Sequence, residues 1–143
     1  MATTLTFTST SFYQGTTMST TASTPATGKD ILGGTTAYDR RLYGISATST
    51  DTVARDMTLW FGTATQSFQI AKIAIPVNAG NTNLIAQVDI LGDSKFAATF
   101  QKQADANGKP YFNLPAGQTL IAGTPQTTAA TFITVHAFGE NYI

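Results

Sequence analysis

Residues 57–76 constrain the fold more than any other part of this sequence, because they form its densest apolar segment. Apolar side chains alternate in the first half of the segment, where Met57, Leu59 and Phe61 share one face of an extended strand. Residues 62–66 then supply a short polar turn before the apolar pattern resumes. The pattern predicts a β-hairpin with a bulky apolar face that another layer must cover.

The second half of this segment changes phase at Ile70. Even-numbered positions are apolar up to that residue, and odd-numbered positions are apolar after it, namely Ala71, Ile73 and Ile75. Two explanations are open. Either both faces of the strand are buried, or a one-residue bulge near Ile70 turns the later side chains toward the core.

Short strands separated by turn residues recur along the rest of the chain, and only residues 95–101 have a helical pattern. The strand from 110 to 114 and the strand from 118 to 122 flank Pro-Ala-Gly, which predicts a second hairpin. About seven strands with almost no helix indicate an all-β antiparallel sandwich, and a jelly roll is the expected topology. The remaining strands are expected at residues 42–48, 83–91 and 131–138.

Two of these strands alternate in a way that assigns their faces. In residues 83–91 the pattern places Leu84, Ala86, Val88 and Ile90 inward. In residues 131–138 both faces hold apolar atoms, so we expect one face on the core and the other on a partner or on the N-terminal segment. The first face holds Ile133, Val135 and Ala137, and the second holds Phe132, Thr134, His136 and Phe138.

Residues 1–38 differ in composition from residues 39–143, so we expect an extended arm followed by a sandwich body, with Gly33 and Gly34 as the hinge. Threonine and serine dominate the arm, which is typical of a disordered terminus. The alternative is that residues 3–10, where Leu5 and Phe7 alternate with threonines, add a strand to a sheet of their own or a neighbouring subunit. Ordering costs about 1–2 kcal/mol per residue, which favours the neighbour as the partner.

Charge and cysteine content exclude several kinds of partner and site. Eight basic and eight acidic residues give a net charge of zero, so nucleic acid and anionic membranes are not expected partners. The chain has no cysteine, which excludes disulfides and thiolate metal sites. The first residues lack the pattern of a signal peptide, and no apolar run is long enough to span a membrane, so we expect a soluble protein made in the cytoplasm.

Catalytic and metal-binding patterns are also missing. His136 is the only histidine, and no G-x-S-x-G motif accompanies it, so a nucleophilic triad is not expected and His136 is predicted to serve packing or an interface. Neither Asp89 with Asp93 nor the turn at residues 105–108 gives the alternating oxygen ligands of a calcium loop. We expect no enzymatic activity, no metal and no cofactor.

Aromatic residues leave one alternative function open. Trp60, Tyr43, Tyr111 and Phe112 would suit the sugar platform of a carbohydrate-binding or host-adhesion module if Trp60 or the Tyr111–Phe112 pair were exposed beside a groove. Core packing is the expected role of Trp60, because aromatic side chains supply much of the burial in small sandwiches.

Three segments carry a pattern that resembles the small virion proteins of tailed bacteriophages: IPVNAG at residues 75–80, DANGKPYFNLPAGQTL at 105–120 and AFGENY at 137–142. The resemblance spans residues 41–143. It implies a capsid decoration or cement protein at the virion surface, which binds the major capsid protein and its own copies, with a trimer as the expected oligomer. A tail or connector component of the same virion is the alternative. The resemblance carries over no catalytic residue.

We expect a set of apolar side chains to contact other subunits or the capsid. The set combines apolar residues near the N-terminus with residues on the second face of the last strand. Its members are Leu5, Phe7, Phe12, Tyr13, Phe132 and Phe138.

Overall fold

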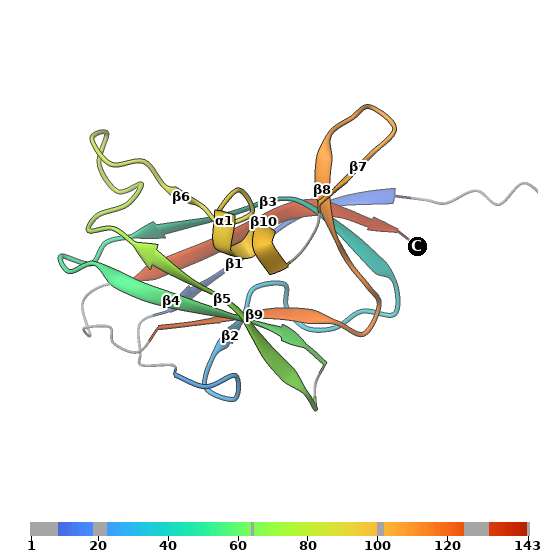
Figure 1. Cartoon of the computed structure of the whole chain (residues 1–143), viewed down its shortest axis with the longest axis horizontal. Helices are drawn as coiled ribbons and strands as arrows, with labels where there is room; N and C mark the ends of the chain where they lie inside the picture. Colours follow the sequence, from blue (N-terminus) through green and yellow to red (C-terminus); the bar gives the residue numbers. More distant parts are fainter. Residues whose placement is uncertain (1–8, 19–22, 64, 100–101, 125–131, 143) are drawn as a thin grey trace, which may run out of the picture.

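The computed structural model describes residues 9–18, 23–63, 65–99, 102–124 and 132–142. These residues form two antiparallel β-sheets that pack face to face, with one short helix, α1 (Ser94–Thr99), against β5 (Ser67–Ile75) (Figure 1). The predicted all-β sandwich is confirmed.

The two sheets are called sheet A and sheet B. Sheet A has the strand order β1 (Ser9–Met18), β10 (Ile133–Tyr142), β3 (Asp39–Ser49), β8 (Pro110–Leu114) and β7 (Gln103–Ala104), and β6 (Val88–Asp89) also pairs with β3. Sheet B has the order β2 (Lys29–Asp30), β9 (Thr119–Gly123), β4 (Arg55–Gly62) and β5.

Strand pairs are nested along the chain. β4 pairs with β5, β3 with β8, β2 with β9, and β1 with β10. The eight strands therefore have the arrangement of one long hairpin that is folded over, so that the chain passes repeatedly between sheet A and sheet B.

The β4–β5 hairpin confirms the prediction for residues 57–76, and its register decides between the two explanations for the phase change. Leu59 lies opposite Ala71, but the next residue, Trp60, lies opposite Gln69, so Ile70 is the extra residue of a β-bulge. The bulge turns the later apolar residues of β5 toward the core, as Ile73 illustrates by its complete burial.

The N-terminal segment is joined to the sandwich. β1 pairs along its whole length with β10 of the same chain. The strand expected over residues 3–10, for which the sequence favoured a neighbouring subunit as the partner, lies outside the described residues except for Ser9 and Thr10. Met18, Ile31 and Leu32 are buried in the core. Leu5 and Phe7 lie outside the described residues.

The predicted strand over residues 83–91 is wrong for most of its length, since only β6 is extended there. Leu84 was expected to face inward but is 88% exposed. Asn78 and Gly80 adopt positive φ angles, and the amide of Gly80 donates a 2.8 Å hydrogen bond to the carbonyl of Ile85. These turn contacts use backbone groups that a strand would need for its ladder.

The predicted second hairpin is also wrong, because β8 lies in sheet A and β9 in sheet B. The turn between them is anchored to the segment around the start of β3. The amide of Ala116 donates to Asp39 Oδ1 at 2.9 Å, and the amide of Gly117 donates to the carbonyl of Thr36 at 2.8 Å. β8 and β9 then pair with β3 and β4 respectively.

The helix prediction is confirmed as a short helix. The Asp93 side chain accepts a 2.8 Å hydrogen bond from the amide of Lys95, which is the contact of a helix N-cap. Phe96 is fully buried in the core, whereas Phe100 lies outside the described residues. The last strand also has the predicted faces, with Ile133, Val135 and Ala137 completely buried.

Candidate interaction surface

The outward face of sheet A carries an exposed aromatic patch, which we define as Tyr13, His136 and Phe138. Tyr13 on β1 lies directly opposite Phe138 on β10, and their side chains are 70% and 45% exposed. The ring of Tyr13 lies 6.1 Å from the ring of His136, measured between centroids. Three ring side chains from two adjacent strands thus form one surface.

Glycine on the neighbouring strand β3 makes room for this patch. Phe138 lies opposite Gly44, and a Cβ atom added at Gly44 would overlap the Phe138 ring. The register of β3 against β10 shifts between Phe138 and Gly139, which leaves Tyr43 as the extra residue on β3. A bulge of this kind changes the direction of side chains at the sheet surface.

Rings and cations alternate beside the patch. Lys109 Nζ lies 4.4 Å from the centroid of the Tyr43 ring and 5.8 Å from that of Phe138. The guanidinium carbon of Arg41 lies 4.1 Å from the Tyr142 centroid and 4.6 Å from the Tyr111 centroid. Cation–π contacts at such distances contribute about 0.5–1 kcal/mol each at exposed sites and limit the motion of these side chains.

Hydroxyl groups of the tyrosines are held by acceptors. Tyr43 donates to Asp105 Oδ2 at 3.2 Å, and Tyr142 donates to Glu140 Oε2 at 3.0 Å. Partial burial, together with its hydrogen bond to Glu140, raises the pKa of Tyr142 to about 12. Burial and the bond to Asp105 likewise raise the pKa of Tyr43.

The Asp105 carboxylate stabilises the β7–β8 turn, which lies beside the row of alternating rings and cations. Its Oδ1 atom accepts hydrogen bonds from the amides of Lys109 and Asn107, both at 2.9 Å. These bonds, with that of Lys109 first, lower the pKa of Asp105. The cations and carboxylates of this surface are interspersed, so it suits docking to a protein better than binding of a polyanion.

Only part of the predicted interface set comes together. Tyr13 and Phe138 are adjacent, and His136 joins them. Phe12 packs against the hydrophobic core. Phe132 precedes β10 and lies beside the loop that follows β3, far from Phe138 along the strand.

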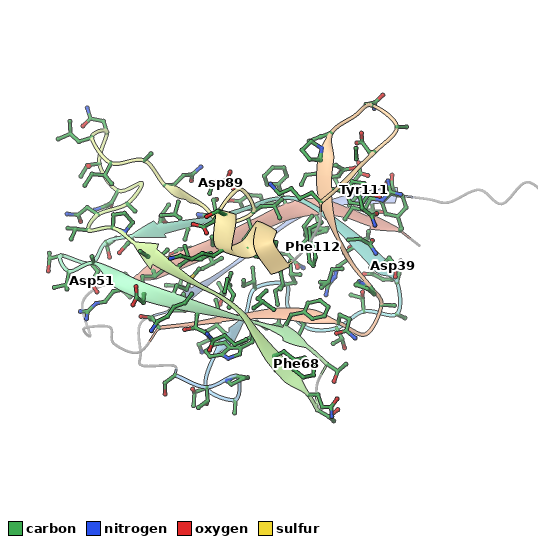
Figure 2. The ribbon with its side chains drawn as sticks, in the orientation of Figure 1. Asp39, Asp51, Phe68, Asp89, Tyr111 and Phe112 are labelled. Carbon is green, nitrogen blue, oxygen red and sulfur yellow. The ribbon has the colours of Figure 1, made fainter. Side chains whose placement is uncertain are left out.

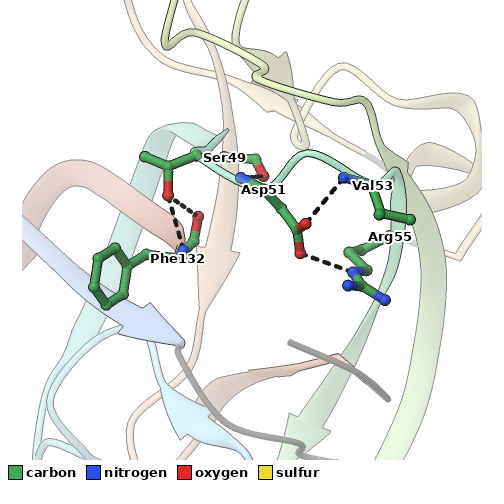
Figure 3. A network of polar contacts seen from close by, with 6 residues as sticks. Ser49, Asp51, Val53, Arg55 and Phe132 are labelled. Carbon is green, nitrogen blue, oxygen red and sulfur yellow. Dashed lines mark hydrogen bonds and ion pairs between the residues drawn. The ribbon is translucent and has the colours of Figure 1, made fainter. Parts of the chain in front are cut away.

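Polar contacts fix the position of Phe132 (Figure 3). The amide of Thr50 donates to the carbonyl of Phe132 at 2.9 Å, and the amide of Phe132 donates to Thr50 Oγ1 at 2.9 Å. In the same loop the buried Asp51 carboxylate accepts hydrogen bonds from the Val53 amide at 2.9 Å and from Arg55 Nε at 2.8 Å. These contacts show that the Asp51 carboxylate stabilises the loop between β3 and β4.

Three of the four rings proposed for a sugar platform are buried, and the fourth, Tyr43, is half-buried beside Lys109. Trp60 is only 5% exposed, and Tyr111 and Phe112 are also buried. Figure 2 shows Phe112 between the two sheets, whereas Tyr111, the preceding residue of β8, lies on the other side of that strand. None of these three residues supplies the exposed ring that the carbohydrate-binding alternative requires.

A depression of about 640 Å³ on the described surface is lined mainly by hydroxyl side chains and lies away from the aromatic patch. Several of its hydroxyls already bind within the chain. Thr119 donates to Asp30 Oδ1 at 2.7 Å, and Thr63 Oγ1 accepts from the Gln66 amide at 3.1 Å. Its lining includes no aromatic ring.

The described ranges hold neither a cluster of metal-ligating side chains nor a helix that could cross a membrane. They contain no group of three or more histidine, aspartate or glutamate residues that could hold a metal ion. The helix found there is too short to cross a membrane.

No family model, curated protein or solved structure matches this chain.

The sequence did not indicate the cation–aromatic row of Arg41, Lys109 and Tyr142. These residues lie on β3, on the β7–β8 turn and on β10, which are far apart along the chain. Local alternation shows only that each side chain is compatible with an outward position. The long-range pairing of β3 with β10 and with β8 brings them together, and no short motif encodes that pairing.

Proposed function

We propose that this protein is a non-enzymatic structural component of a bacteriophage virion, which decorates and stabilises the capsid by bridging major capsid subunits. The observation that supports docking is the aromatic patch on the outward face of sheet A, where Tyr13 and Phe138 remain exposed. Aromatic residues that are exposed on a sheet face are typical of interface centres. The resemblance of residues 41–143 to virion proteins of tailed phages supports the capsid as the partner.

The proposal includes a jelly-roll topology for the sandwich. Nested pairing of β4 with β5, β3 with β8, β2 with β9 and β1 with β10 supports it, because a jelly roll is a folded-over hairpin divided between two sheets. That topology is frequent among viral capsid domains.

Binding to particles that lack the protein tests the docking role of the patch. We expect Tyr13→Ser and Phe138→Ser each to weaken co-sedimentation with such particles at least about tenfold, since interface anchors contribute roughly 1.4 kcal/mol or more. Phe68→Ser is the matched control, because Phe68 is also an exposed aromatic residue but lies on β5 of sheet B. Unchanged binding of both patch variants would contradict the proposal.

Copy number separates a head protein from the tail or connector alternative. Quantitative mass spectrometry of purified particles should find hundreds of copies per particle for a capsid decoration protein. A dozen copies would instead identify a tail or connector component.

A further inference from the structure

The edges of the two sheets differ in how they are protected. In sheet B, β2 has two residues, and β5 carries the bulge at Ile70 and an ion pair in which Lys72 Nζ lies 3.7 Å from Asp56 Oδ2. In sheet A, β7 on the side opposite β1 also has two residues. Short strands, bulges and edge charges are the features by which proteins prevent unwanted strand pairing.

β1 has none of these features. It is a ten-residue edge strand without proline and without Asp, Glu, Lys or Arg, and its register with β10 is continuous from Ser9 to Met18. Among the described strands only β10 pairs with it, so one side of β1 carries backbone donors and acceptors that no described strand uses. Such an edge is a template for another strand.

We propose that β1 pairs antiparallel with β1 of a second copy of this chain, which joins the two A sheets across a two-fold axis. A two-fold contact uses the same surface on both copies, so each strand must be complementary to itself. β1 meets this condition because it has no formally charged side chain, and the net charge of the whole chain is zero. Two copies therefore approach without charge repulsion.

Side-chain direction restricts the register of this pair. Residues opposite each other across antiparallel strands point to the same face, so Tyr13 must meet an outward-facing residue of the second copy. When Gln14 lies opposite Gln14 of the second copy, Tyr13 lies opposite Gly15 in both halves of the contact. The same combination occurs within the chain, where the Phe138 ring lies over Gly44.

This register extends the aromatic patch across the dimer. Tyr13, which is highly exposed in one chain, would cover Gly15 of the second copy beside His136 of that copy, because Gly15 and His136 are opposite each other within a chain. Aromatic side chains over glycine stabilise adjacent strands by covering exposed backbone. The proposed state is a dimer, which differs from the trimer that the family resemblance implies.

Disulfide trapping tests the contact directly, because the natural chain has no cysteine. Residues opposite each other in an antiparallel pair have Cα atoms about 4.5–5.5 Å apart, which is within the range that a disulfide spans. We expect Gln14→Cys to form a covalent dimer within minutes of mild oxidation at micromolar concentration. Gln69→Cys, at an exposed position on the β5 edge, is the matched control and should remain mostly monomeric.

Charge substitutions test the same register without a covalent bond. Sedimentation equilibrium of the purified full chain should show a dimer. Gln14→Lys and Gln14→Glu should each weaken dimerisation at least tenfold, because like charges then lie directly opposite each other. Mixing the two variants in equal amounts should restore a dimer, because opposite charges then lie across the contact. If either variant were misfolded, mixing would not restore the dimer.

A monomeric wild-type chain at the highest attainable concentration would overturn the proposal, as would failure of Gln14→Cys to cross-link faster than the control. A wild-type monomer whose Gln14→Lys variant no longer binds particles would overturn it too, in favour of a strand from another protein. All the self-association measurements use the purified protein alone, so their outcome is independent of the proposed virion function.

Discussion

Arg40 donates a hydrogen bond from Nη1 to the main-chain carbonyl of Leu32 at 3.2 Å, inside the protein. Its Nη2 atom donates to the carbonyls of Gly34 and Gln118, both at 3.0 Å. Arg40 is 2% exposed, and this burial lowers the pKa of its guanidinium, although the charge of Asp30 opposes that shift. One side chain of β3 thus fixes the segment that precedes it and the turn that leads into β9.

Replacing Arg40 with methionine removes these donors and leaves the three carbonyls without them. We expect Arg40→Met to reduce the free energy of unfolding by about 2–4 kcal/mol. Leaving the three carbonyls without donors destabilises the protein more than relief from burying the guanidinium charge stabilises it. Urea denaturation followed by circular dichroism measures the loss. Arg41→Met is the control: the adjacent Arg41 lies on the outward face and should lose less than about 1 kcal/mol. Equal losses would contradict this role of Arg40.

Deletion of residues 1–36 tests how far the N-terminal segment belongs to the core. The composition of these residues predicts a separate arm, but the truncation removes β1, β2 and the buried Met18, Ile31 and Leu32. Burial of each such side chain contributes about 1.5–3 kcal/mol, so the sum is comparable to a typical domain stability of about 5–15 kcal/mol. We therefore expect the truncated chain to lose cooperative thermal unfolding.

Deletion of residues 1–8 is the control for this truncation, since it leaves all three of these core side chains in place. That variant should retain a cooperative transition in calorimetry. A truncation of residues 1–36 that unfolded at the wild-type temperature would instead support the division of the chain at residue 38.

Local alternation predicted those strands whose apolar pattern is complete within one short segment. The β4–β5 hairpin follows from the position of apolar residues within one segment, and the phase change at Ile70 indicated a bulge as one of two explanations. The bounds of β8 were also predicted, because Pro110 and Pro115 limit the apolar run. In these cases most apolar residues of the local pattern are ones that the folded sandwich buries.

Prediction failed where long-range contacts or unusual backbone angles decide the structure. Leu84 and its neighbours alternate as a strand would, but the positive φ angles of Asn78 and Gly80 place them in successive turns. The pairing of Tyr13 with Phe138 joins two ends of the chain through the β1–β10 register. The sequence indicated that both residues suit an interface, but it could not show that they are adjacent.

Two glycines at the β3–β10 bulge should differ in their tolerance of alanine. A Cβ atom at Gly139 would overlap the main-chain carbonyl oxygen of Arg41, whereas the atoms nearest to one at Gly44 belong to the Phe138 ring. The exposed ring can rotate away, but the backbone of a paired strand cannot move without strain.

We therefore expect Gly139→Ala to cost about 2–3 kcal/mol of stability and Gly44→Ala less than about 1 kcal/mol. The two variants serve as controls for each other, since both add one methyl group at the same bulge. Differential scanning calorimetry measures the two shifts in melting temperature. A larger shift for Gly44→Ala would show that the Phe138 ring is held more firmly than the backbone.

Stability at alkaline pH should depend on Tyr142. Its pKa is raised from the ordinary value of 10.0 to about 12 by burial and by the hydrogen bond to Glu140. In this interval the unfolded chain releases the phenolic proton while the folded chain keeps it, so the free energy of unfolding falls as pH rises from 10 to 12. Below pH 10 both states are protonated, and this contribution to stability is fully present.

Tyr142→Phe isolates the effect, because phenylalanine keeps a ring beside Arg41 but has no proton to release in this range. Other ionisable groups titrate in both proteins, so their effect on the free energy of unfolding cancels in the comparison. We expect the stability advantage of wild type over Tyr142→Phe, measured by urea denaturation at a series of pH values, to shrink between pH 10 and 12. A constant difference from about pH 9 upward would mean that the hydroxyl of Tyr142 titrates alike in the folded and unfolded chain, and that its bond to Glu140 does not hold the proton.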